Sequence, residues 1–244
     1  MLTIKAWPLL SIFLFSLLVF PGCRDRIFDN PFDPEASEAL FEVVNTILTP
    51  AAVPLGLTWD GNTLWNADGY TDILYSLNRF NGALVRSLAS PQALLSGVTF
   101  DGEDLWICSE AGATIFKVGI LTGGIQKRLD LQKGAFSALV YGSGGALWIA
   151  DSLSNQILQV DSSTGEILSS FANPGKRVDG LAFDGGSLWL SDSTTLTIYQ
   201  VSLQGGVLKT FLSPGQAPRG LAFDGIDLWH VDANQKLYQL RLKY

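Results

Sequence analysis

Short apolar stretches alternate with turn-forming residues along the chain after residue 40, and one pattern occurs five times. The copies begin GLTWDGNTLWNAD at Gly56, GVTFDGEDLWICS at Gly97, ALVYGSGGALWIAD at Ala138, GLAFDGGSLWLSD at Gly180 and GLAFDGIDLWHVD at Gly220. Each copy contains a Leu-Trp pair, and the five tryptophans are separated by 41, 42, 41 and 40 positions. A period of about 40 residues is typical of β-propeller blades.

Each copy predicts four short strands, because turn-forming residues separate its apolar segments. The first strand, such as GLAF from Gly180, ends at an Asp-Gly pair, which tolerates the positive φ of a tight reversal. The second strand contains the Leu-Trp pair, and the third alternates apolar with polar residues, as in IYQV from Ile198. Four strands per copy, with no helical periodicity after residue 40, predict an all-β, five-bladed propeller.

The fifth copy contains only three predicted strands, and an additional strand precedes the first copy. The segment VVNTILTP from Val43 matches VLKTFLSP from Val207 and ILSSFANP from Ile167, down to the final proline. We therefore expect Val43–Leu48 to complete the fifth blade and close the ring, which also covers an edge prone to aggregation. The propeller then spans residues 41–244, with no second domain.

The repeated tryptophans and the Asp-Gly turns have structural interpretations. Large residues in the first strands alternate with small ones such as Thr58 and Ala182, so neighbouring blades can stack face to face. We expect the tryptophans to form the core between blades, with stacking on carbohydrate as the alternative. Turn chemistry explains four aspartates that precede glycine: Asp60, Asp101, Asp184 and Asp224.

Residues 1–22 differ in character from the rest of the chain. Lys5 precedes an apolar run of 15 residues, Ala6–Phe20, whereas a membrane-spanning helix needs about 20. The run is followed by Gly22-Cys23, which resembles the lipobox of bacterial lipoproteins. The segment predicts a signal peptide over residues 1–22 and a lipid on Cys23. An ordinary secretory signal with an incidental cysteine is the alternative.

The following residues, 23–40, are mostly polar and include two prolines, which is typical of a tether. Arg24 follows the cysteine, where an aspartate would signal retention in the inner membrane of enteric bacteria. We therefore expect a lipid-anchored protein of the bacterial cell envelope, with the outer membrane favoured over the inner one.

Composition excludes several classes of function. The chain has 23 acidic and 16 basic residues, a net charge of −7, whereas phosphate binding requires a basic surface; nucleic acid is therefore not an expected partner. One histidine and two cysteines leave neither a His-cluster metal site nor a disulfide framework. The sequence contains no GxSxG, HExxH or P-loop motif, so we predict no metal, no cofactor and no catalytic residue.

The connections between strands 2 and 3 and between blades meet on one face of a propeller, which we call the loop face. Polar residues there that the repeat does not explain form the predicted ligand-binding site: Tyr70, Asp72, Glu110, Lys176, Arg177, Asp179 and Arg219. Asp179 and Arg219 occupy equivalent positions before the glycine of a first strand, so both are expected near the central channel. A protein, peptide or glycan is the expected partner on this face.

Other polar residues of the loop face fit a structural role. One aspartate ends the second strand in four of the copies and is expected to accept backbone N–H bonds: Asp68, Asp151, Asp192 and Asp232. A shared cation site is the alternative, although the chain contains no DxDxDG-like loop. We expect His230 to be packed and hydrogen-bonded, and Cys108 to be a buried small residue rather than a nucleophile.

Several bacterial propellers resemble this sequence. The segment ADSLSNQILQVDSSTGEIL from Ala150 is similar to NHL-type and YncE-like units. The five-blade count and GLTWDGNTLWNADGY from Gly56 resemble the plant and bacterial type of glutaminyl-peptide cyclotransferase, a five-bladed propeller that cyclises N-terminal glutamine. That family has a glutamate directly after the aromatic residue of the second strand, where this chain has Asn66, which cannot act as a general acid or base.

Two functions from different classes follow. The first is a non-enzymatic binding module in the cell envelope that contacts its partner through the loop face. The second, implied by the resemblance, is a glutaminyl cyclase-like enzyme acting on exported peptides. The first is favoured, because Asn66 replaces the expected acidic residue and no nucleophile–base pair occurs at matched positions.

Overall fold

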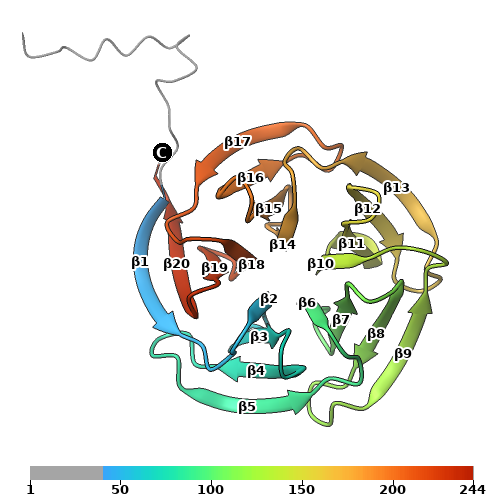
Figure 1. The fold of residues 1–244 in the computed structure, drawn as a ribbon, viewed down its shortest axis with the longest axis horizontal. Coiled ribbons are helices and arrows are strands. Elements are labelled where there is room, and N and C mark those ends of the chain that lie inside the picture. Colours follow the sequence, from blue (N-terminus) through green and yellow to red (C-terminus); the bar gives the residue numbers. More distant parts are fainter. Residues whose placement is uncertain (1–40, 244) are drawn as a thin grey trace, which may run out of the picture. The chain divides into compact units, whose positions relative to one another are not determined.

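The computed structural model describes residues 41–243. The predicted signal peptide 1–22, the lipidation site Cys23 and the tether 23–40 lie outside the described residues. The described part folds into five antiparallel sheets of four strands each, arranged as blades around a common centre (Figure 1). The predicted five-bladed propeller is therefore confirmed. Among the described residues, no helix is long and apolar enough to cross a membrane.

Each blade places its first strand at the centre and its last at the periphery (Figure 1). Blade 1 contains β2 (Pro54–Trp59), β3 (Leu64–Asp68), β4 (Ile73–Leu77) and β5 (Leu84–Ala89). Blade 2 contains β6 (Leu95–Phe100), β7 (Leu105–Ser109), β8 (Thr114–Val118) and β9 (Ile125–Asp130). Blade 3 contains β10 (Phe136–Tyr141), β11 (Ala146–Asp151), β12 (Gln156–Asp161) and β13 (Ile167–Ala172). Blade 4 contains β14 (Val178–Phe183), β15 (Leu188–Asp192), β16 (Thr197–Val201) and β17 (Val207–Leu212).

Blade 5 combines segments from both ends of the propeller. It contains β18 (Pro218–Phe223), β19 (Leu228–Asp232) and β20 (Lys236–Leu242), with β1 (Phe41–Leu48) as its outermost strand. β1 pairs antiparallel with β20, so that Ile47 lies opposite Leu237 and Thr46 opposite Tyr238. The predicted closure by Val43–Leu48 is confirmed, and the strand starts two residues earlier than predicted.

The five inner strands approach one another closely at the centre. The repeated small residue there is Gly56, Gly97, Ala138, Gly180 or Gly220. A Cβ atom on Gly56 would lie 2.6 Å from the backbone nitrogen of Val98, so glycine is required for this contact. The small residues and their neighbours surround a central space too narrow for a water molecule. The propeller therefore has no open channel at this level, and a ligand cannot pass through its centre.

The repeated tryptophans are buried between blades, as predicted. Trp65, for example, packs with Leu95 and Val98 of the next blade in one core cluster. In four blades the indole Nε1–H donates to the aspartate of the Asp-Gly turn, five residues earlier. The same aspartates accept turn N–H groups, so the Asp-Gly turn and the Leu-Trp pair form one structural unit. With their rings enclosed by the core, these tryptophans cannot stack on carbohydrate.

Candidate functional site

The mouth of the propeller on the loop face is bounded by the residue before the small residue of each inner strand. The five residues at this position are Leu55, Ser96, Ser137, Asp179 and Arg219. The hydroxyl of Ser96 donates to the carbonyl of Phe136 at 2.5 Å, and that of Ser137 to the carbonyl of Val178 at 2.6 Å. These bonds join inner strands of neighbouring blades, so the two serines are occupied by structural contacts.

The charged members of the mouth form a network that we call the rim cluster: Glu110, Arg177, Asp179 and Arg219. The Asp179 side chain is only 3 % exposed, and its Oδ1 accepts from Arg177 Nε at 2.7 Å and from Arg219 Nη1 at 3.1 Å. Arg177 also donates from Nη2 to Glu110 Oε1 at 2.6 Å. The rim cluster therefore links blades 2, 4 and 5 across the mouth.

The electrostatics of the rim cluster depend on the buried carboxylate. The hydrogen bond from Arg177 to Asp179, together with charge attraction to Asp179 and Glu110, raises the pKa of the Arg177 guanidinium above its usual value. Arg177 is nevertheless 43 % exposed and Glu110 is 38 % exposed. Ion pairs at such exposure contribute little to stability, so Glu110 can be displaced from Arg177 at small cost.

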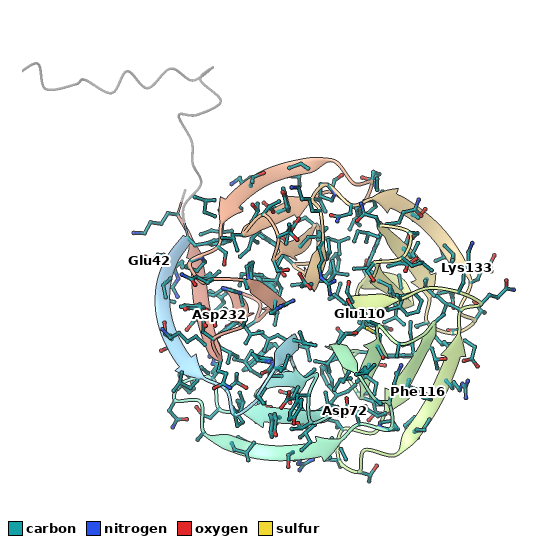
Figure 2. The ribbon with its side chains drawn as sticks, in the orientation of Figure 1. Glu42, Asp72, Glu110, Phe116, Lys133 and Asp232 are labelled. Atoms are coloured by element: carbon teal, nitrogen blue, oxygen red, sulfur yellow. The ribbon has the colours of Figure 1, made fainter. Side chains whose placement is uncertain are left out.

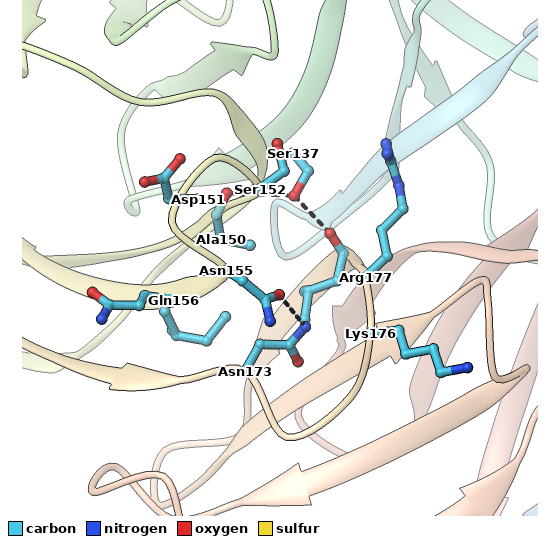
Figure 3. A pocket seen from close by; sticks show the side chains of 11 residues that line it. Ser137, Ala150, Asp151, Ser152, Asn155, Gln156, Asn173, Lys176 and Arg177 are labelled. Atoms are coloured by element: carbon cyan, nitrogen blue, oxygen red, sulfur yellow. Dashed lines mark hydrogen bonds between the residues drawn. The ribbon is translucent and has the colours of Figure 1, made fainter.

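Three of the predicted site residues do not join this network. Tyr70 is 77 % exposed on its loop. Asp72 has a positive φ of 56° and accepts the N–H of Leu95 at 3.1 Å, so it supports the loop between blades. Lys176 is exposed, and Figure 3 shows its side chain pointing away from Asn155 and Asn173. Figure 2 places Glu110 close to the centre of the ring and Asp72 farther out.

Two cavities flank the rim cluster on the loop face. One, of about 160 Å³, is lined by Arg177 and by Asn155 and Asn173, whose side chains are joined by a 3.0 Å hydrogen bond (Figure 3). The other, of about 250 Å³, is lined by Glu110 together with Leu55 and Leu94. The Arg177–Glu110 ion pair therefore joins the walls of a polar cavity and a largely apolar one.

Asn173 was not predicted as a site residue, although the sequence contains a signal for it. It precedes a proline in the connection between blades, and the three other copies that have this proline carry Thr49, Ser90 or Ser213 before it. A departure from the repeat at that position marks a side chain with a different environment.

The aspartates that end the second strands are structural, as expected. Asp68 accepts backbone N–H groups from Ala52, Val53 and Tyr70 at 2.9–3.0 Å. Burial raises the pKa of this carboxyl, but these hydrogen bonds outweigh burial and hold the pKa of Asp68 below its usual range. The other three members also accept N–H groups from turns or loops: Asp151, Asp192 and Asp232. Within residues 41–243, no cluster of His, Cys, Asp and Glu could hold a metal ion.

Asn66 is fully buried and acts as an internal cross-link. It accepts from the hydroxyl of Thr49 at 2.7 Å and donates to the carbonyl of Gly56 at 2.9 Å. Both ends of its amide are thereby occupied within blade 1 and the connection that precedes it. The position where the resemblance implies a glutamate is therefore closed to substrate.

His230 occupies the position equivalent to Asn66 in blade 5 and is also fully buried. Its Nε2 lies 3.3 Å from the hydroxyl of Ser213, and its ring stacks on Tyr238 at 5.2 Å between centroids. Burial lowers the pKa of His230 to about 4. The expected packed, hydrogen-bonded histidine is confirmed, although Nδ1 has no partner among the described residues.

Cys108 is the remaining candidate nucleophile, and it is fully buried. Burial raises the pKa of its thiol to about 12, so the reactive thiolate is not formed near neutral pH. The expectation that Cys108 is a buried small residue is confirmed.

Comparison with known proteins places the chain by fold alone. No family model matches the sequence, and no curated protein matches it. A glutaminyl cyclase structure from Myxococcus xanthus superposes with a TM-score of 0.72 at 13% identity, covering 84% of this chain and 97% of that one. A virginiamycin B lyase from Staphylococcus aureus gives 0.52 at 20% identity, covering 80% and 68%. The WD40 propeller domain of Doa1 gives 0.53 at 14% identity, covering 75% and 62%.

Proposed function

We propose that the chain is a lipid-anchored, non-enzymatic binding module of the bacterial cell envelope, whose ligand is a peptide or protein segment bearing a carboxylate. The anchor at Cys23 and the envelope location rest on the sequence of residues 1–23. The binding site is the rim cluster with its two flanking cavities.

The Arg177–Glu110 ion pair carries this proposal. Asp179 fixes Arg177 through Nε, which leaves the Nη2 edge of the guanidinium for a second carboxylate. Glu110 now occupies that edge from an exposed position on another blade. A carboxylate of the ligand can replace Glu110 on Arg177, with the two-pronged geometry that arginine favours. The next side chain of the ligand can then enter the apolar cavity.

A second candidate, a glutaminyl cyclase-like enzyme, is favoured by the superposition on the Myxococcus xanthus structure. Three observations oppose it. Asn66 is enclosed by Thr49 and Gly56, and His230 and Cys108 are buried with pKa values that suit neither a general base nor a thiolate near neutral pH. Asp179 and Arg219 meet at the mouth, but Asp68 and His230 are fully buried and line neither of the two cavities there.

Fluorescence anisotropy tests the binding site. N-acetylated, dye-labelled peptides ending in Asp-Glu should bind, whereas matched peptides ending in Asn-Gln with an amidated terminus should not. Arg177→Ala should weaken binding at least about tenfold. Arg128→Ala, which removes an exposed ion pair on the outer strand of blade 2, is the control and should leave binding unchanged. Equal affinity for both peptides would overturn the proposal.

A pyroglutamate-formation assay on a peptide with N-terminal glutamine tests the alternative. We expect no turnover above the uncatalysed rate. Turnover that disappears in Asp179→Asn or Glu110→Gln would show that the rim cluster is catalytic and would replace the binding proposal.

Lipid anchoring has its own test. Metabolic labelling with an alkyne fatty acid should mark the wild-type chain and leave Cys23→Ala unlabelled, with the variant released from membranes. A wild-type chain that is unlabelled and soluble would refute the anchor while leaving the rim cluster untouched.

A further inference from the structure

A cavity of different character lies at the seam between blades 3 and 4, and we call it the seam cavity. Its volume is about 450 Å³, which is within the range of small-molecule sites. Five lining residues come from blade 3 and two from the turn between β16 and β17 of blade 4: Trp148, Gln159, Ser169, Ser170, Phe171, Leu203 and Gln204. None of these side chains is titratable.

The first origin of the seam cavity is a missing carboxylate. In the other four blades the Trp indole donates to the aspartate of the Asp-Gly turn, at 2.7–2.9 Å. Blade 3 has Gly142 at that position, followed by a longer turn that contains the short 3-10 helix η1 (Ser143–Gly145). Among residues 41–243, no group accepts a hydrogen bond from the indole N–H of Trp148.

The second origin is a short side chain at one position of the outer strand, which is occupied by Ser169 in blade 3. At three other seams this position holds a residue that donates to a backbone carbonyl in the next blade's turn. The bonds run from Arg86 to Ile120, from Lys127 to Ser163 and from Asn45 to Arg79. Blade 3 has Ser169 there, and its hydroxyl instead donates to Gln159 Oε1 within the same blade, at 2.8 Å. The blade 3–4 seam is therefore not crossed by this kind of contact.

The two departures act on the same space. Each removes one contact that other blades make, and the residues that lose these contacts, Trp148 and Ser169, both line the seam cavity. Trp148 contributes an indole N–H, Gln159 an amide NH₂, and Ser169 and Ser170 contribute hydroxyls. Phe171, whose ring lies 6.0 Å from that of Trp148, and Leu203 supply apolar surface.

We propose that the seam cavity binds a neutral sugar ring. A sugar has hydroxyls that can accept from the indole and amide groups and exchange hydrogen bonds with the serines. Its C–H face suits Phe171 and Leu203. The absence of any charged group from the lining disfavours an ionic ligand, because an ion would lose hydration without gaining a partner. This site is independent of the rim cluster, which is charged and lies on the loop face.

The test uses the full chain and four uncharged saccharides: glucose, galactose, N-acetylglucosamine and diacetylchitobiose. Saturation-transfer NMR and tryptophan fluorescence should show saturable binding of at least one of them. Trp148→Phe keeps an aromatic side chain, although a smaller one, and removes the N–H donor; it should weaken binding at least about fivefold. Ser169→Lys should abolish binding, because a long basic side chain would cross the seam as Lys127 does in blade 2.

Lys127→Ser is the matched control. It replaces lysine by serine at the position of blade 2 that is equivalent to Ser169, and it should leave saccharide binding unchanged. Thermal melting establishes that each variant is folded. The proposal is overturned if no saccharide binds saturably, if a folded Ser169→Lys variant binds as the wild type does, or if Lys127→Ser weakens binding equally.

Discussion

On the face that carries the Asp-Gly turns, the same set of hydrogen bonds occurs in four blades. In each, an aspartate accepts from a tryptophan indole and from the turn that follows the aspartate. On the loop face, the rim cluster of Glu110, Arg177, Asp179 and Arg219 occurs once and joins three different blades. The first arrangement follows the repeat and is found in every blade except blade 3, which has Gly142 in place of the aspartate. The second does not follow the repeat, because its ion pairs join side chains that the other blades do not have at the equivalent positions.

This contrast separates residues that maintain the fold from residues available to a ligand. Contacts that follow the repeat are buried and mutually satisfied, so their loss should reduce stability. Contacts that depart from the repeat at an accessible position should affect stability little and binding strongly. Four predictions test this distinction, in order of decreasing expected effect on the free energy of unfolding.

Removal of β1 should have the largest effect, because it exposes the edge of β20 and the core residue Leu237. A chain beginning at Pro50 should lose cooperative thermal unfolding or aggregate, measured by circular dichroism and size-exclusion chromatography. A chain beginning at Phe41 is the control and should melt as the full chain does. Unchanged melting of the shorter chain would contradict closure by β1.

His230 should make stability depend on pH. Its pKa is about 4 when folded and about 6.5 when unfolded, so between these values the unfolded state binds more protons. Stability should therefore fall by about 2–3 kcal/mol as pH is lowered from about 6.5 to about 4.5. His230→Leu, which copies Leu190 at the equivalent position of blade 4, should remove this part of the pH dependence in urea titrations. An identical pH profile in both proteins would contradict the buried neutral histidine.

Asp184→Ala should cost about 1–3 kcal/mol, because it leaves the buried indole of Trp189 without an acceptor. Asp161→Ala is a suitable comparison, since Asp161 also accepts two turn N–H groups but bonds no tryptophan. Urea unfolding should show the larger loss for Asp184→Ala. Equal losses would mean that the carboxylate–indole bond contributes nothing beyond the turn.

Glu110→Ala should have the smallest effect on stability, within about 1 kcal/mol, because its ion pair with Arg177 is substantially exposed. The same variant frees the Nη2 edge of Arg177, so binding of the Asp-Glu peptide in the anisotropy assay should tighten. Large destabilisation would show that the rim cluster is structural, and the contrast between the two faces would fail.

The repeat made most of the fold predictable, because a period near 41 residues specifies the strands and the spare strand at Val43 specifies closure. Local sequence also predicted the roles of Asp184 and His230. It could not establish that Glu110 pairs with Arg177, because these residues are 67 positions apart and meet only through the geometry of two loops. The third copy has Gly142 where the others have the turn aspartate, but the seam cavity depends equally on Ser169, whose equivalents in three other blades contact the next blade.

The pairing of β1 with β20 joins the two ends of the propeller, and we expect it to form late in folding. Ile47 and Leu237, which lie opposite each other, are separated by 190 positions in the chain. Blades 1 to 4 can each form from contiguous sequence, whereas blade 5 must wait until nearly the whole chain has been made. We therefore expect β1 to stay unpaired during that interval, when its polar residues Glu42 and Asn45 would oppose pairing with a neighbouring molecule. Because pairing between distant segments is slow, we expect ring closure to be the last and slowest step in the folding of this propeller.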